Sequence, residues 1–211
     1  MNKNEKYVIT INRELGSGGR TVGRLLAEKL GVPYYDKALT KALEEKFNLS
    51  KTQIEELKGN NRSWWEELKR VLALGEEAAN SSEYYDEEEN KYITSEAVLK
   101  AEREILQGIA SEESCVIAGR SAFFAMKDHP NRLSILIQAS MEHRVKRVMA
   151  KQGLSEKEAK KAIEMVDETR EEYMKNNAHT SRYDTRNYDL VIKMDDKTEE
   201  DAVNTILAYI G

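Results

Sequence analysis

The amino-acid sequence predicts an α/β fold in which a five-stranded parallel sheet carries helices on both faces. Short runs of apolar and β-branched residues, typical of buried strands, alternate with longer segments of helical periodicity. This alternation favours parallel strands joined by helical crossovers. The two prolines, Pro33 and Pro130, both fall near the start of such a run, where a strand tolerates the missing N–H. The strands are expected at residues 7–11, 32–35, 115–118, 133–137 and 190–193.

The first expected strand runs directly into a glycine cluster, and a helical pattern follows the cluster at once. A loop of this kind lines up consecutive backbone N–H groups, and the helix that it opens adds partial positive charge at its N-terminus. Strand, glycine turn and helix together therefore predict a phosphate-binding site, with a nucleotide as its ligand. The residues expected to bind the phosphate are Gly16, Ser17, Gly18, Gly19, Arg20 and Thr21.

The glycine cluster is similar to a P-loop, but it lacks the lysine of that motif. Arg20 and Thr21 stand where a P-loop places its phosphate-gripping cation and its magnesium-binding hydroxyl. In this register Glu14 replaces the first glycine, whereas a register anchored on the helix puts Gly19 at the lysine position. Because an arginine grips phosphate through its planar fork, Arg20 is predicted to supply the cation and Thr21 to contact Mg²⁺.

Two other interpretations of the glycine cluster stay open. One is a glycine-rich turn that binds no ligand. The other is a dinucleotide site, since Gly16-x-Gly18 opens a G-x-G-x-x-G pattern and Asp36 follows at a distance suited to a ribose. That pattern fails at Thr21, and a long helical stretch follows Asp36 in place of a compact βαβ repeat.

Composition excludes several classes of function. A net charge of −5 and a pI near 5.5 argue against nucleic-acid binding as the main role. The single cysteine, Cys115, excludes an internal disulfide and a cysteine-based zinc site, and it is expected to be buried in its strand. No apolar run approaches the length of a membrane span. The sequence therefore predicts a soluble cytoplasmic protein that binds neither membranes nor nucleic acid.

Two polar residues stand at the ends of predicted strands. Ligands of open parallel sheets bind beyond the carboxyl ends of the strands, where Asp36 and Arg120 are expected. Arg120 is predicted to contact an anionic ligand. For Asp36 three roles stay open: ordering magnesium-bound water, accepting a hydrogen bond from a substrate, or capping the helix that follows.

The second half of the chain carries arginines suited to phosphoryl transfer. Arg144 and Arg147 are three residues apart, hence on one helix face, and Arg170, Arg182 and Arg186 follow. Phosphoryl transfer needs phosphates held in line and cations on the charge of the transferring group. Arg144, Arg147 and Arg170, with Arg20, are the expected catalytic residues, although each arginine is equally able to pair with a nearby glutamate.

Several segments together resemble the cytidylate kinase-like family, relatives of the nucleoside monophosphate kinases. The resemblance covers nearly the whole chain apart from about residues 58–95. It is carried by Ile-Asn-Arg-Glu-Leu-Gly-Ser-Gly-Gly-Arg (11–20), Leu-Ala-Glu-Lys-Leu-Gly-Val-Pro-Tyr-Tyr-Asp-Lys (26–37), Val-Ile-Ala-Gly-Arg-Ser (116–121) and Gln-Ala-Ser-Met-Glu-His-Arg-Val-Lys-Arg-Val (138–148), with Asp-Glu-Thr-Arg (167–170) and Asn-Tyr-Asp-Leu-Val-Ile (187–192) in the same order.

This resemblance implies a P-loop kinase fold with helical NMP-binding and lid subdomains. The core would comprise residues 1–36, 111–148 and 188–211, the NMP-binding insertion residues 37–110, and the lid residues 150–187. Gly16 to Thr21 would hold the phosphates of ATP, whose Mg²⁺ is the second implied cofactor. Asp36 and Arg120 would lie at the acceptor, while Arg144, Arg147 and Arg170 would come from the lid and its flanking helices.

The function that the resemblance implies is transfer of a phosphoryl group from Mg-ATP to a nucleoside monophosphate, with CMP as the first candidate. Cytidylate kinases have Asp-Gly-Arg-Asp where this chain has Ala118-Gly119-Arg120-Ser121, so both flanking carboxylates are absent. A kinase of another small metabolite and a non-catalytic nucleotide-binding or regulatory module stay open as alternatives. The expected partner is a small-molecule nucleotide, and a homodimer is left open.

Overall fold

The computed structural model describes residues 1–36, 103, 106–119 and 122–211. The chain divides into two compact units, Met1–Tyr34 with Ile105–Gly211, and Tyr35–Glu104. The first unit contains the glycine loop and all of the sheet except the last residues of its second strand. Most of the insertion predicted at residues 37–110 lies outside the described residues.

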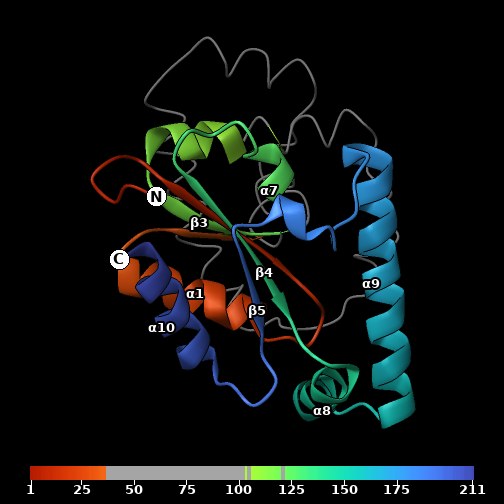
Figure 1. Ribbon diagram of the computed structural model, residues 1–211. Helices are drawn as coiled ribbons and strands as arrows, with labels where there is room; N and C mark the ends of the chain where they lie inside the picture. Colours follow the sequence, from red (N-terminus) through yellow and green to blue (C-terminus); the bar gives the residue numbers. More distant parts are fainter. Residues whose placement is uncertain (37–102, 104–105, 120–121) are drawn as a thin grey trace, which may run out of the picture. The chain divides into compact units, whose positions relative to one another are not determined.

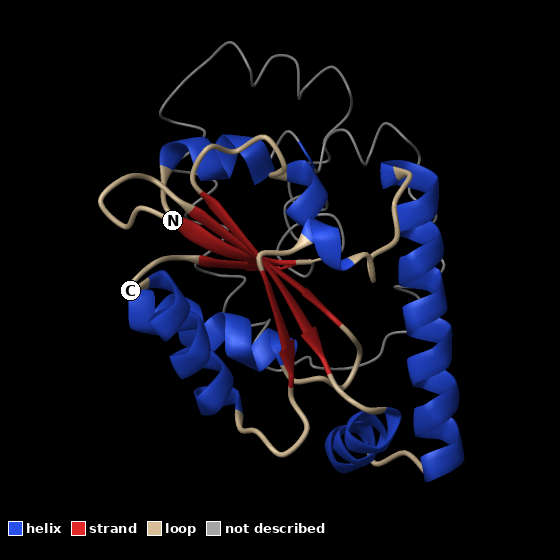
Figure 2. Ribbon diagram, in the orientation of Figure 1, coloured by secondary structure: helices blue, strands red, loops and turns tan. Residues whose placement is uncertain are grey.

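A five-stranded sheet forms the centre of the first unit, as the sequence predicts (Figure 2). Its strand order is β2-β3-β1-β4-β5, and β1 pairs in parallel with both β3 and β4. The strands are β1 (Val8–Arg13), β2 (Tyr34–Asp36), β3 (Cys115–Ala118), β4 (Arg132–Gln138) and β5 (Leu190–Lys193). The last three agree with the predicted runs to within one residue at each end. The first two begin and end later than predicted, so that β1 extends to Arg13.

Helices lie on both faces of this sheet (Figure 1). On one face α1 (Gly19–Leu30) and α10 (Glu199–Ile210) bury an apolar core against the strands. Ile9 and Ile11 from β1 belong to that core, together with Val22 and Leu26 from α1. The short helix α7 (Ala122–Ala125) lies on the other face. Burial of these apolar side chains fixes α1, and with it the glycine loop, against the central strand.

Two further helices form a smaller core of their own. They are α8 (Met141–Gln152) and the long α9 (Glu156–Ala178), followed by the 3-10 helix η1 (Thr185–Asn187). Val145 and Val148 of α8 pack with Ala159 and Ile163 of α9, and Leu15 of the glycine loop packs against the same cluster. The loop is therefore held between two apolar cores. The residues predicted as a lid, 150–187, consist mainly of α9, and their motion stays a prediction.

Two expectations from composition can be compared with the structure. Cys115 is fully buried, as expected for a strand cysteine, and burial raises the pKa of its thiol to about 12. Such a thiol is unreactive at neutral pH. Across the part of the chain that the structure describes, none of the helices combines the length and the apolar character that crossing a membrane requires.

Candidate functional site

The loop between β1 and α1 turns tightly around one carbonyl oxygen. Ser17 donates both its backbone N–H and its hydroxyl to the carbonyl of Glu14, at 3.3 Å and 2.9 Å. Gly16 and Gly18 have φ angles of 79° and 82°, in the left-handed region that glycine enters without a steric penalty. The glycines thus let the chain reverse between strand and helix within a few residues.

Two glycines of the loop also permit close packing. A Cβ atom at Gly16 would lie 2.8 Å from the carbonyl oxygen of Arg144 on α8. A Cβ atom at Gly19 would lie 2.7 Å from Cβ of Arg13 and 3.1 Å from Cβ of Ile137. These distances are shorter than normal van der Waals contacts, so both positions exclude a side chain. Position 19 therefore has no room for the side chain of the lysine that a P-loop carries.

The N-terminus of α1 differs from those of the other long helices. Ser140, Ser155 and Thr198 cap α8, α9 and α10 by accepting a backbone hydrogen bond, and each of these helices has acidic residues in its first turn. Helix α1 begins after Gly18, and within the described residues it has neither a side-chain cap nor an acidic first turn. Its first backbone N–H groups and the positive end of its dipole therefore favour an anion from outside the protein.

Arg147 is the predicted arginine that the structure brings to this helix end. Its guanidinium pairs with Glu199 of α10 at 2.6 Å and donates to the hydroxyl of Thr21 at 3.4 Å. A Cβ atom at Gly18 would lie 3.4 Å from Cζ of Arg147. Arg147 therefore lies beside the turn that opens α1.

The structure describes two of the three remaining predicted residues, Arg20 and Asp36. Arg20 is the second residue of α1, and its carbonyl accepts a hydrogen bond from Tyr34 at 3.4 Å. Asp36 ends β2, as predicted, and its side chain is buried. Arg120 lies outside the described residues. The roles assigned to these three residues stay predictions.

Arg144 lies in a buried group of charges beneath the loop. Its guanidinium binds the carboxylate of Asp167 on α9 and lies 3.8 Å from the carboxylate of Glu14. Glu14 in turn accepts a hydrogen bond from the backbone N–H of Ala139 at 3.0 Å, and Asp167 accepts one from that of Leu15 at 3.4 Å. These contacts tie the start of the glycine loop to the residue that follows β4, to α8 and to α9.

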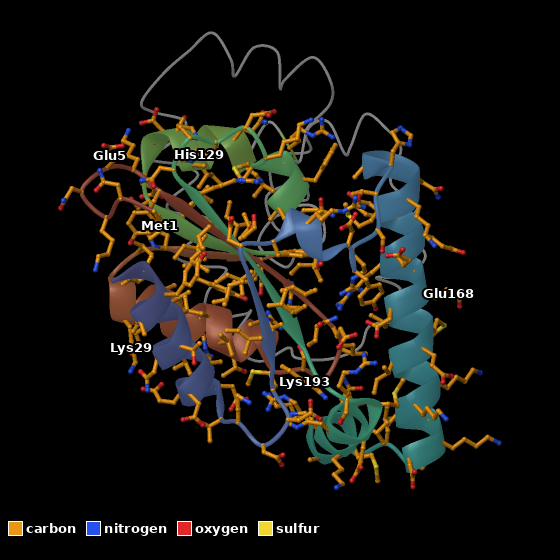
Figure 3. All side chains as sticks on the ribbon, in the orientation of Figure 1. Met1, Glu5, Lys29, His129, Glu168 and Lys193 are labelled. Atoms are coloured by element: carbon orange, nitrogen blue, oxygen red, sulfur yellow. The ribbon has the colours of Figure 1, made fainter. Side chains whose placement is uncertain are left out.

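Arg182 completes this group, and Arg170 lies beside it. The side chain of Arg182 is 1% exposed and lies 3.5 Å from the carboxylate of Asp167. Arg182 also donates to the carbonyl oxygen of Arg13, which accepts a second hydrogen bond from Arg170 at 3.3 Å. On α9 the neighbouring Glu168 points away from the sheet (Figure 3), so only one of the two adjacent carboxylates serves the group. We call Glu14, Arg144, Asp167 and Arg182 the buried charge network.

This network contains the residues that reasoning from sequence missed. From the sequence, Glu14 stands out only as the residue at a P-loop glycine position, and Arg182 only as one of several arginines. Asp167 lies in the Asp-Glu-Thr-Arg segment of the family resemblance, which was the single available signal for it. The partners are up to 168 positions apart in the chain, from Glu14 to Arg182. Local periodicity carries no information about such pairs.

Burial raises the pKa of Glu14, and the nearby Asp167 adds to that rise against the opposing effects of Ala139 N–H, Arg144 and Arg182. A carboxyl whose pKa is higher in the folded than in the unfolded state binds its proton more tightly when folded. Its contribution to stability is therefore present at low pH and is lost as pH rises from the unfolded value, about 4.5, through the folded one.

We expect the variant Glu14→Gln to remove this pH dependence. Urea unfolding between about pH 4.5 and 7.5 should show the wild-type protein losing stability relative to the variant as pH rises. Glu142→Gln is the matched control, because its hydrogen bond from Lys146 lowers the pKa of Glu142 and gives the opposite sign. A wild-type protein that gains stability relative to Glu14→Gln over this range would contradict the assignment.

Comparisons with known proteins agree with this fold. An uncharacterized protein from Eubacterium ventriosum is 26% identical, with a TM-score of 0.67 and 98% of each chain covered. A shikimate kinase from Bacteroides thetaiotaomicron shares the fold at 17% identity, with a TM-score of 0.51, covering 97% of this chain and 98% of its own. No curated protein matches the chain. A family model described as the cytidylate kinase-like family matches residues 8–196, from β1 through the glycine loop to just beyond β5, and the chain therefore belongs to that family.

Proposed function

We propose that this protein is an ATP-dependent phosphotransferase that acts on a small acceptor, with a nucleoside monophosphate, CMP first, as the leading candidate. The observation that carries the proposal is the N-terminus of α1, which follows a glycine loop and has neither a side-chain cap nor an acidic first turn within the described residues. Membership of a kinase-like family supports phosphoryl transfer as the reaction class.

In such a reaction the protein would bind the phosphates of ATP, orient them and neutralise their charge. Backbone N–H groups of Gly18, Gly19 and Arg20 would hold the phosphates of ATP at the end of the helix. Arg147 lies beside them and would place positive charge on the transferring group. The buried charge network holds the loop in one conformation. Donors that are already in place stabilise the charge of the transferring group without having to rearrange during the reaction. Asp36 and Arg120 are proposed to bind the acceptor.

Magnesium enters this proposal as part of the substrate Mg-ATP, where it neutralises phosphate charge. The surroundings of Thr21 do not fit a metal ion that the protein holds without ATP. The guanidinium of Arg147 donates to the Thr21 hydroxyl, and the nearby carboxylate of Glu199 is already paired with the same arginine. Within the described residues no group of three His, Cys, Asp or Glu side chains is arranged to hold a metal ion. A contact between the Thr21 hydroxyl and the Mg²⁺ that ATP brings stays a prediction.

A second candidate function is a nucleotide-binding module without catalysis. The lack of lysine between residues 14 and 21 favours it, because the backbone alone suffices to bind phosphate whereas transfer needs a cation on the γ-phosphate. A kinase of a different small metabolite is the other alternative. For either kinase we expect a small-molecule nucleotide as partner, with no membrane or nucleic acid, in the cytoplasm; a homodimer is left open.

A coupled assay of ADP release distinguishes these functions. The full chain is incubated with ATP and each of a panel of nucleoside monophosphates and small alcohols, with and without Mg²⁺. The proposal predicts ADP release that needs both Mg²⁺ and one acceptor, CMP being tested first. ADP release with a non-nucleotide alcohol would show that this alcohol, and not a nucleoside monophosphate, is the acceptor. ATP binding in calorimetry without release for any acceptor would favour the non-catalytic module and contradict the proposed activity.

A further inference from the structure

Arg13 is the last residue of β1, and its side chain lies against the first residue of α1. Side chains alternate along a strand, so Arg13 shares a face with Ile9 and Ile11, which pack with α1 in the core. The contacts agree, since a Cβ atom at Gly19 would lie 2.7 Å from Cβ and 3.4 Å from Cδ of Arg13. The aliphatic part of Arg13 therefore runs along the N-terminal end of α1.

The backbone of Arg13 is held from both sides. Its N–H donates to the side-chain oxygen of Asn12 at 2.9 Å. Its carbonyl oxygen accepts hydrogen bonds from Arg170, at 3.3 Å, and from the buried Arg182. A side chain that leaves such a fixed point has a defined direction, which is the requirement for a pre-organised binding group.

The charge of Arg13 is available to a ligand. Arg144, Arg147, Arg182 and Arg186 each form an ion pair with a carboxylate. In the described ranges of the chain, the guanidinium of the half-buried Arg13 takes part in no ion pair. The charge stands next to the N-terminus of α1, where helix dipole and backbone N–H groups already favour an anion.

We propose that Arg13 supplies the phosphate-gripping cation of this glycine loop, in place of the missing lysine. The inference rests on the proposed nucleotide binding at the loop. Its argument is that Gly19 and Arg13 are complementary: any side chain at position 19 would overlap Arg13, and the glycine leaves room for it. A guanidinium binds two phosphate oxygens at once, which suits it to the terminal phosphates of a nucleotide.

Arg20, the cation that the P-loop pattern predicts, lies in the first turn of α1. Arg20 and Arg24 are four residues apart and share one helix face. Burial lowers the pKa of Lys151 at the end of α8, and the charges of Arg24 and Arg20 lower it further while Glu199 raises it. Arg20 thus lies within electrostatic reach of Lys151, and a variant of Arg20 tests the role that the P-loop pattern gives it.

Calorimetry with ATP and ADP tests the inference on the full chain. Arg13→Met keeps the aliphatic volume against Gly19 and removes the charge, so we expect ATP affinity to fall by about ten- to a hundredfold, the range of a lost charge-assisted hydrogen bond. Arg13→Lys should restore most of the affinity. Arg24→Met, an exposed arginine of the same helix, is the control and should stay within about twofold, because an exposed charge contributes little.

A measurement on the wild-type protein gives the same test without a substitution. Phenylglyoxal modifies accessible arginines, and mass spectrometry locates them; ATP should protect Arg13 but leave Arg186 unprotected. Unchanged ATP affinity in Arg13→Met, or modification of Arg13 that ATP does not reduce, would overturn the role of Arg13 while leaving nucleotide binding intact. Failure of the wild-type protein to bind ATP at millimolar concentration would overturn both the inference and the proposed function.

Discussion

Replacing Asp167 with alanine is expected to lower the free energy of unfolding by about 3–5 kcal/mol, the range for removing one partner from a buried ion pair. The side chains of Arg144 and Arg182 that face Asp167 are 8% and 1% exposed. The Nε atoms of both arginines are buried and, among the described residues, have no hydrogen-bond partner. Without Asp167, two poorly solvated cations would face Glu14 alone.

Urea unfolding of Asp167→Ala and Glu168→Ala provides the comparison. Glu168 is the next residue on α9 and is exposed, so its removal should change the free energy of unfolding by less than about 0.5 kcal/mol. Because Asp167 also accepts a hydrogen bond from the N–H of Leu15, the Asp167 variant should bind ATP more weakly than the Glu168 variant. A loss of less than about 1 kcal/mol in Asp167→Ala would show that the network contributes no more than a surface pair.

The variant Gly16→Ala is expected to lose about 2–5 kcal/mol. One part of the loss, about 1–2 kcal/mol, is the cost of a non-glycine residue in the left-handed region at φ 79°. The other part, about 1–3 kcal/mol, is overpacking, because the new Cβ atom would lie 2.8 Å from the carbonyl oxygen of Arg144. Relief of that clash would separate the loop from α8, and we therefore expect ATP affinity to fall as well.

Gly153→Ala is the matched control for this variant. Gly153 has φ 68°, close to that of Gly16, but a Cβ atom there would meet no heavy atom within 4 Å. Thermal unfolding of the two variants should therefore show a loss of only about 1–2 kcal/mol for Gly153→Ala. Equal losses in both would mean that backbone conformation alone explains the glycine at position 16, and that the loop does not pack tightly against α8.

The strands and the glycine loop follow from local sequence, and the structure agrees with that part. Runs of β-branched residues and the alternation with helical segments suffice for a parallel sheet, because both patterns depend on neighbours in the chain. The loop is equally local, since glycines at positions 16 and 18 are needed where φ is positive. The ends of the strands are less well determined by local sequence, and the predicted end of the first strand affects the interpretation of Arg13.

The first strand was expected to end at residue 11, whereas β1 continues to Arg13. Within a strand, alternation would have placed Arg13 on the same face as Ile11, toward α1. The P-loop register predicts Arg20 as the cation, and a strand that ends at residue 11 gives Arg13 no defined face. The buried charge network was beyond reach for another reason. Its members come from the start of the glycine loop, α8, α9 and the segment after α9, and only tertiary packing brings them together.

The central claim is that phosphate binds to the backbone of the glycine loop, and nuclear magnetic resonance of the protein labelled with ¹⁵N-glycine tests it directly. The chain has 11 glycines, so the spectrum is simple. ATP, ADP and tripolyphosphate should shift the amide signals of Gly16, Gly18 and Gly19, while Gly31, at the far end of α1, stays in place. ATP that binds without shifting the three loop signals, or that shifts none at millimolar concentration, would contradict the account.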